Sequence, residues 1–344
     1  ATTLLCCHRD LASLARERYS APMVAWLSLA LGVCLALLGC EGPPDSVEQE
    51  PLVFELLYDD LPALSDVCSP RGRLFAVGRR EGQGVFIEER ESGLVEVDLA
   101  LEVEAPVAPL LACWQAEDGE LFAVGGAHVL VRSPAGDYSL DDLSDAGSVE
   151  LFDVISSPAL GPLAVGSIDG TGAMFRLGEE GGWQPVDLGD DPIPPLIRVA
   201  VSGERAYIIG QFGEVIRWQD GDSQRLVSLN DRLTGVAVSG DDALVFALDG
   251  AVLRVEGNDL VPFAQLEARW LDGGFTANGN LWLSGRSGVA ARHLRKTSDQ
   301  LAAVPRRADV PETADLIAVE PGRDRLMILA AENQSSQLWV LDSE

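Results

Sequence analysis

Residues 196–229 read LIRVAVSGERAYIIGQFGEVIRWQDGDSQRLVSL. This stretch contains four short apolar runs separated by three turn clusters, SGE, QFGE and QDGDS. The runs are rich in Val, Ile and Leu and too short for a helix, and a pattern of this kind is typical of strands. The stretch therefore predicts one four-stranded antiparallel sheet.

The same pattern recurs along the rest of the chain. LFAVG occurs at 74–78 and again at 121–125, and VAVSG occurs at 199–203 and 236–240. A glycine closes the second predicted strand of most units, and we call these the register glycines: Gly78, Gly125, Gly166, Gly210 and Gly285. Units begin near residues 66, 109, 151, 196, 233, 269 and 315, a period of about 40 residues that indicates a repeat architecture.

Four strands per unit at this period predict an all-β fold, a β-propeller with seven four-stranded blades. The last unit supplies only three apolar runs, whereas residues 51–58, PLVFELLY, form an extra run ahead of the first unit. We expect this N-terminal strand to complete the last blade and close the ring, which leaves no edge unpaired. Six blades with irregular ends, or eight blades, are the alternatives.

The third predicted strand of five units ends in arginine, at Arg132, Arg176, Arg217, Arg254 and Arg292. The whole unit is clearest at 163–186 and 207–227. It resembles the BNR/Asp-box group of propeller repeats, in particular the photosystem II assembly factor-like and YVTN-type propellers of bacteria. The resemblance implies a propeller over 51–344 and raises assembly-factor activity as one possibility, although the Asp-box S-x-D-x-G-x-T-W itself is absent. Because propellers host many functions, it implies little about activity.

The N-terminal region has the features of an export signal. Three arginines precede the apolar run 23–39, and the run ends in small residues, as secretory signal peptides do. The ending LLGC at 37–40 resembles the bacterial lipobox, which implies cleavage after residue 39 and lipidation of Cys40. An uncleaved membrane anchor is the alternative, because the run is close to the minimum length of a spanning helix.

We therefore divide the chain into a signal peptide (1–39), an acidic Pro-containing tether (40–50) and the propeller (51–344). By resemblance to Gram-negative sorting rules, Glu41 after the acylated cysteine favours the outer membrane, with the propeller facing the periplasm or the cell surface.

The formal net charge of −29 excludes some classes of partner. Nucleic-acid binding and docking on anionic lipid through surface charge both need a basic face. We interpret the acidity as a source of solubility by self-repulsion and expect a monomer.

The recurring arginines allow two interpretations. They would form a basic ring for an anionic ligand, or they would make ion pairs between blades; we favour the ion pairs, because acidic residues are abundant in every unit. Cys68 and Cys113 lie in the first strands of the first two units. A disulfide between them is possible in an exported protein, with two buried thiols as the alternative.

No stretch of the sequence has the spacing of a metal, cofactor or catalytic site. His128 and His293 are not spaced with Cys, Asp or Glu as metal ligands are. The clusters 220–222 and 239–242 lack the ligand order of a calcium loop, so we interpret them as solvated turns. Tryptophans recur at blade positions and are expected to pack in the core rather than form a sugar platform: Trp114, Trp183, Trp218, Trp270, Trp282 and Trp339.

These observations favour a non-enzymatic, lipid-anchored propeller that binds a protein or glycan partner at its rim or central mouth. The competing hypothesis is a glycosidase or lyase at the ring mouth. Such an enzyme would need several carboxylates, together with a Tyr or His, converging on the axis.

Overall fold

The structure, a computed structural model, describes residues 55–69, 73–189, 191–219, 221–228, 232–276, 278–293, 301–304, 313–321, 325–332 and 334–342. The contact pattern divides the chain into Ala1–Leu52 and Val53–Glu344, and all described residues belong to the second unit. The predicted signal peptide and tether, with Cys40, lie outside the described residues. No helix within the described ranges has the length and hydropathy needed to cross a membrane.

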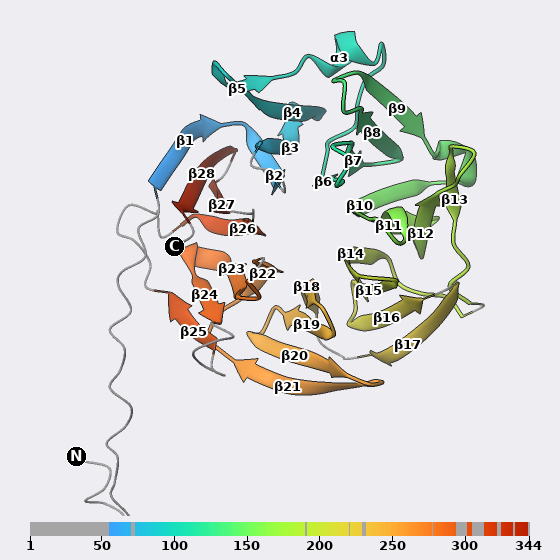
Figure 1. The fold of residues 1–344 in the computed structure, drawn as a ribbon, viewed down its shortest axis with the longest axis vertical. Coiled ribbons are helices and arrows are strands. Elements are labelled where there is room, and N and C mark those ends of the chain that lie inside the picture. Colours follow the sequence, from blue (N-terminus) through green and yellow to red (C-terminus); the bar gives the residue numbers. More distant parts are fainter. Residues whose placement is uncertain are drawn as a thin grey trace, which may run out of the picture. The chain divides into compact units, whose positions relative to one another are not determined.

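The described residues form seven four-stranded antiparallel sheets, which we number as blades in chain order (Figure 1). Blade 1 comprises β2 (Ala63–Cys68), β3 (Phe75–Arg80), β4 (Gln83–Arg90) and β5 (Gly93–Glu96). Blade 2 comprises β6 (Ala112–Gln115), β7 (Leu121–Gly125), β8 (His128–Arg132) and β9 (Tyr138–Asp142). Blade 3 comprises β10 (Val149–Ser157), β11 (Gly161–Ile168), β12 (Thr171–Leu177) and β13 (Trp183–Pro185).

The remaining blades follow the same order. Blade 4 comprises β14 (Leu196–Ser202), β15 (Arg205–Gly210), β16 (Glu214–Gln219) and β17 (Asp222–Ser228). Blade 5 comprises β18 (Leu233–Ser239), β19 (Asp242–Ala247), β20 (Ala251–Glu256) and β21 (Asp259–Gln265). Blade 6 comprises β22 (Trp270–Phe275), β23 (Leu281–Gly285), β24 (Ala290–His293) and β25 (Leu301–Val304). Blade 7 comprises β26 (Asp315–Pro321), β27 (Arg325–Glu332), β28 (Ser335–Asp342) and β1 (Glu55–Leu61).

The first strand of each sheet is the innermost one, and these seven strands surround a common axis (Figure 1). Neighbouring inner strands contact each other around the whole ring, in the order β2, β6, β10, β14, β18, β22, β26 and back to β2. The prediction of an all-β propeller built from four-stranded blades is therefore confirmed.

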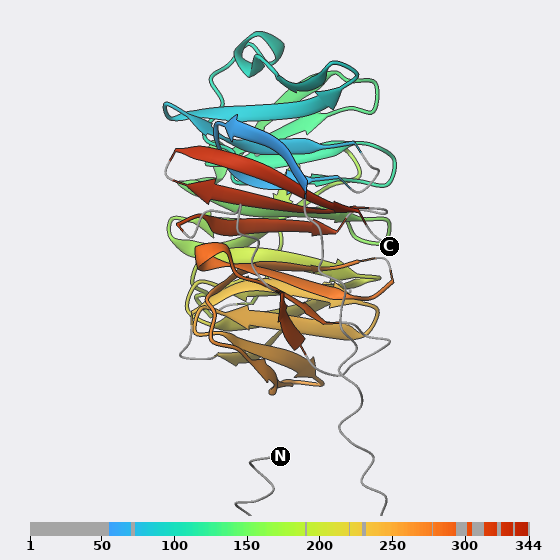
Figure 2. The ribbon, with the colours of Figure 1, turned by 90° about the vertical axis from the view of Figure 1, so that its left-hand side faces the viewer.

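Strand β1 lies at the outer edge of blade 7 and joins the two ends of the propeller. It pairs antiparallel with β28, with Glu55 opposite Val340 and Tyr58 opposite Leu338. In the side view β1, in blue, runs beside the red strands of blade 7 (Figure 2). The sequence predicts this strand at 51–58, and the paired strand begins and ends a few residues later.

Apolar side chains fill the space between neighbouring blades. One cluster joins Leu329 and Leu338 of blade 7 to Val67 and Leu74 of blade 1. Because each sheet is covered on both faces, its inner strands read as continuous apolar runs rather than as alternating patterns.

The register glycines have a steric explanation. A Cβ atom on Gly125 would lie 1.9 Å from the carbonyl oxygen of Pro109, and one on Gly166 would lie 1.9 Å from that of Glu150. At Gly78, Gly125, Gly166 and Gly285 the backbone at the start of the inner strand lies too close for a side chain, whereas at Gly210 the Glu214 side chain occupies the space. The approach occurs next to a bulge in the inner strand, such as the one between Leu151 and Asp153.

Short helical segments interrupt the all-strand pattern. The helix α3 (Leu99–Glu102) lies in the linker between blades 1 and 2, where Asp98 accepts a hydrogen bond from the Leu101 N–H. The 3₁₀ turns η1 (Ser144–Ala146) and η2 (Arg286–Gly288) lie in other connections. The short apolar runs predict no long helix in the propeller, and these segments of three or four residues do not conflict with that prediction.

Cys68 and Cys113 are joined by a disulfide, with their Cα atoms 6.0 Å apart. Cys68 ends β2 and Cys113 lies in β6, so the bond links the inner strands of blades 1 and 2. Both residues are buried.

Candidate functional site

Each inner strand places one residue at the same height on the ring axis, and in every blade except blade 2 this residue follows a bulge. This residue pairs with the one that precedes the register glycine or its equivalent, as Asp66 pairs with Val77 and Asp153 pairs with Val165. Bulges commonly re-aim a side chain, here toward the axis. We call these residues the axial positions, and in blade order they are Asp66, Ala112, Asp153, Arg198, Gly235, Asp272 and Ala318.

The three axial aspartates connect neighbouring blades. Their Oδ2 atoms accept backbone N–H groups of the next inner strand: Asp66 from Cys113 at 2.9 Å, Asp153 from Val199 at 2.8 Å and Asp272 from Val319 at 2.9 Å. The Oδ1 atoms of Asp66 and Asp153 also accept the N–H of the following residue, at 2.8 and 2.9 Å. These carboxylates therefore have a structural role, because they satisfy backbone donors at the blade junctions.

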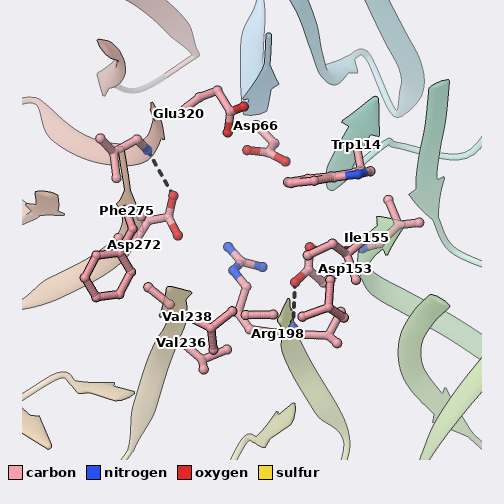
Figure 3. Close-up of a pocket in the computed structure, with 18 of the residues that line it drawn as sticks. Asp66, Trp114, Asp153, Ile155, Arg198, Val236, Val238, Asp272, Phe275 and Glu320 are labelled. Atoms are coloured by element: carbon pink, nitrogen blue, oxygen red, sulfur yellow. Dashed lines mark hydrogen bonds between the residues drawn. The ribbon is translucent and has the colours of Figure 1, made fainter. Parts of the chain in front are cut away.

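Two further carboxylates line the same cavity, Glu117 and Glu320, and Glu320 lies two residues beyond the axial position of blade 7. The Oε1 of Glu320 accepts the Ser69 N–H of blade 1 at 3.4 Å, a longer contact than those of the aspartates. The side chain points into the central space near Asp66 (Figure 3).

Arg198 is the counter-charge at the axis. Its guanidinium points toward the centre, between Asp153 and Asp272 (Figure 3), and donates to the Ile197 carbonyl at 3.2 Å. In the part of the chain that the structure describes, no ion-pair contact joins Arg198 to a carboxylate. The three axial aspartates therefore share one cation at longer range.

The surroundings of these groups shift their pKa values. Burial raises the pKa of Asp153 to about 6, against the charge of Arg198, and raises the pKa of Glu320 to about 7. Burial, and next the charge of Asp272, raise the pKa of Asp66 well above its usual value. Burial also raises the pKa of Asp272.

The pKa of Arg198 is raised, although burial alone would lower it. Burial acts to lower it, but the charges of Asp153, Asp272 and Asp66 outweigh that effect and raise it. The guanidinium is therefore held in its charged form by the carboxylates around it.

These residues line a cavity of about 590 Å³. Apolar side chains form a second layer, two or three residues further along the inner strands, which we call the collar: Trp114, Ile155, Val238 and Phe275. Two or three residues of strand span about 7–10 Å, so the collar lies nearer the ends of the inner strands than the charges do. The cavity thus has the axial charges at its floor and a mostly apolar mouth, with Glu320 at the level of the collar and Glu117 also in the lining.

The structure does not bring the recurring arginines to the axis. Arg132 makes the predicted inter-blade ion pair, with its Nε 3.2 Å from Glu88 Oε2 in blade 1. The ion-pair prediction is wrong as a general rule. Within the described residues, Arg176 and Arg254 make no ion pair and lie over aromatic rings. Arg292 lies over the ring of Trp282. Arg217 donates to Gly257 and Asn258 of the next blade.

The other candidates have mostly structural surroundings. His128 Nδ1 accepts the Ala108 N–H at 3.2 Å, and the side chain of His293 lies outside the described residues. Asp241 pairs with Arg205, while Asp220 is not described. The described residues contain no group of three His, Cys, Asp or Glu that could hold a metal ion.

The tryptophans divide into two kinds. Five are buried in the core, as predicted: Trp183, Trp218, Trp270, Trp282 and Trp339. Trp114 is the exception, because it lines the cavity at the collar. Trp114 also packs against two core clusters, as predicted, so it combines core packing with a place in the cavity lining.

The sequence analysis did not identify the axial positions or Glu320. A signal was present, because LSDV at 64–67, LFDV at 151–154 and LIRV at 196–199 place one charged residue at the same point of an apolar run. A charge inside a run that is otherwise buried needs a partner or a cavity. Aligning the first strands, rather than the second and third, would have shown these residues.

Three solved structures resemble this chain in fold. The WD40 propeller domain of Doa1 matches with 12% identity and a TM-score of 0.60, over 84% of this chain and 97% of that one. YCF48 bound to D1 peptide matches with 15% identity and a TM-score of 0.64, over 87% and 99%. U3-55K matches with 10% identity and a TM-score of 0.65, over 84% and 98%. No family model and no curated protein matches the sequence.

Proposed function

We propose that this protein is a lipid-anchored, exported binding module, and that a segment of a protein partner enters the axial cavity. One observation carries the proposal: the cavity of about 590 Å³, with an apolar collar above a charged floor. Ligand sites are typically concave and mostly apolar, with a few convergent polar groups that fix orientation. The similarity to a propeller solved with a peptide, YCF48 with D1 peptide, makes a peptide segment a reasonable occupant.

Two features support the export part of the proposal. The lipobox-like ending at Cys40 would place a lipid anchor directly before the tether and the propeller. The Cys68–Cys113 disulfide fits an oxidising compartment, because such bonds rarely persist in the cytosol.

A glycosidase or lyase is the second candidate, and the converging carboxylates with raised pKa values favour it. Two further observations weigh against it. Asp66 and Asp153 each accept backbone N–H groups on both oxygens, so both carboxylates already serve as structural acceptors at the blade junctions. The described residues that line the cavity also include no Tyr or His. Glycan hydrolysis that Glu320→Gln abolishes would establish the enzyme and overturn the binding proposal.

Crosslinking in intact cells tests the proposal. We expect the double variant Trp114→Ala/Phe275→Ala to reduce the yield of the partner crosslink about tenfold or more, because buried aromatic anchors dominate binding energy. Phe212→Ala is the matched control. Phe212 is 63% exposed and lies in the turn between β15 and β16, at the end of the blade that is opposite to the collar. Equal yields from the double variant and the control, with both proteins folded, would show that the cavity face is not the binding face.

A further inference from the structure

The charged side chains that line the cavity are distributed asymmetrically. Asp272, Glu320 and Asp66 come from three consecutive blades, 6, 7 and 1, and their inner strands contact each other in that order. Figure 3 shows these three carboxylates along one side of the cavity, with Arg198 and Asp153 on the other. We call this group of three the anionic wall.

The chain supplies little positive charge to the anionic wall. Arg198 is the only basic side chain among the described residues that line the cavity, and it belongs to blade 4. Its charge lowers the pKa values of Asp66, Asp153 and Asp272, but it has no such effect on Glu320. Carboxylates at depth without a paired cation are costly to ionise, so a cation from outside would be bound favourably.

The space beside the anionic wall suits an organic cation. No group of three carboxylates among the described residues could hold a metal ion. The aromatic side chains of Trp114 and Phe275 also line the cavity, at the collar level. Aromatic faces attract guanidinium groups, and the apolar stem of a long basic side chain packs well against a collar of this kind.

We propose that the cavity binds an arginine side chain of the partner segment, with its stem at the collar and its guanidinium at the anionic wall. Arginine is favoured over lysine because its planar fork bonds to two carboxylates at once and stacks on aromatic rings. This inference rests on the proposed function and specifies the chemistry that the same site recognises.

Two short peptides that differ in one charge test the inference. The probes are acetyl-Leu-Arg-Leu-amide and the same peptide with citrulline, the neutral isostere of arginine, titrated into the full chain by calorimetry at low salt. We expect the arginine peptide to bind about tenfold more tightly than the citrulline peptide, since the anionic wall interacts only with the charged form.

Glu320→Gln should remove most of this preference while keeping the acceptor for the Ser69 N–H. Asp272→Asn is a second variant, in case the first alters the fold. Glu179→Gln removes the same charge from an exposed turn between β12 and β13 and should leave the preference unchanged.

The outcomes separate the inference from the proposed function. Equal binding of the two peptides, no binding of either at millimolar concentration, or an undiminished preference in both cavity variants would overturn the inference. If the crosslink to the partner still depended on the collar in that case, the binding function would stand with a different ligand chemistry. Loss of both results would reject both proposals.

Discussion

At the scale of single residues, the axial aspartates combine structure with charge. Asp66, Asp153 and Asp272 each close a blade junction with a hydrogen bond to the next inner strand. The same carboxylates give the cavity its negative potential. A change at one of these positions would therefore alter both stability and binding, and the two effects need separate measurements.

Glu320 allows a prediction about pH. Its pKa rises to about 7 in the folded protein because burial disfavours the charged form. A raised carboxyl pKa contributes stability that is present at low pH and is lost as the pH rises through the folded value. We expect Glu320→Gln to raise the free energy of unfolding at pH 8 by about 2 kcal/mol, and to change it little at pH 4.

The measurement is denaturant unfolding of both proteins between pH 4 and pH 8, followed by tryptophan fluorescence. Subtracting the two curves removes the general repulsion that comes from the net charge of −29. Glu179→Gln, an exposed acid, serves as the control and should parallel the parent at every pH. A constant difference between Glu320→Gln and the parent across this range would contradict the raised pKa.

Residue-level prediction from the sequence succeeds where a local rule applies. The register glycines were recognisable because the repeat displays them, and Gly125 indeed has no room for a Cβ atom. Cys68 and Cys113 were considered as partners because both lie in first strands. Asp66 and Arg198 were missed because the charged position that they share becomes visible only when the first strands of the units are aligned with one another.

At the scale of elements, strand β1 decides whether the ring is closed. It covers β28, and Tyr58 and Leu61 pack against a cluster that includes Leu338 and Val340. Without this strand the outer edge of blade 7 would expose unpaired backbone groups. Strand β1 was predictable because the last unit has only three apolar runs and an extra apolar run precedes the first unit.

We expect deletion of residues 51–58 to lower the free energy of unfolding by about 3 kcal/mol, since it removes Tyr58 and the first backbone pairs with β28. The midpoint of thermal unfolding is the measurement. Leu101→Ser, in the short helix α3, is a control at a position that is 76% exposed, and it should unfold like the parent. An unchanged midpoint in the deletion variant would show that β1 does not hold the ring closed.

The bulges of the inner strands were not predictable at this scale. A bulge adds one residue to one strand, so it shifts the apolar pattern by a single position. In LFDVISS at 151–157 the bulge falls between Leu151 and Asp153, inside a run that is apolar at most positions. A bulge can be detected in a sequence only as a break in the alternation of apolar and polar residues. Because these strands do not alternate strictly, the extra residue leaves no such break.

At the scale of the whole molecule, the repeat predicts the architecture and hides the site. Each blade is recognised by the sequence features that it shares with the other blades. The cavity is lined by residues at positions where the blades differ. The axial charges come from four of the blades, about 40 residues apart or more, and only ring closure brings them together. A single sequence therefore predicts the propeller ring well and the residues that line its central cavity poorly.

The overall charge bears on how the protein would stay at a membrane. A propeller in a chain with a formal net charge of −29 is repelled by anionic lipid, so surface charge would not hold it there. A lipid on Cys40 would then be the attachment. We expect Cys40→Ser to release the protein into the soluble fraction and to lack the mass of the diacylglyceryl group, as fractionation and mass spectrometry would show.

Cys34→Ser is the matched control, because Cys34 lies in the same apolar run but outside the lipobox-like ending. It should remain lipidated and membrane-bound, since the acylated residue must be the one that follows the cleavage point. If the Cys40→Ser protein stayed at the membrane without an acyl group, the apolar run 23–39 would have to act as an uncleaved anchor. The propeller would then be tethered by a helix instead of a lipid, and the binding proposal would persist with a different attachment.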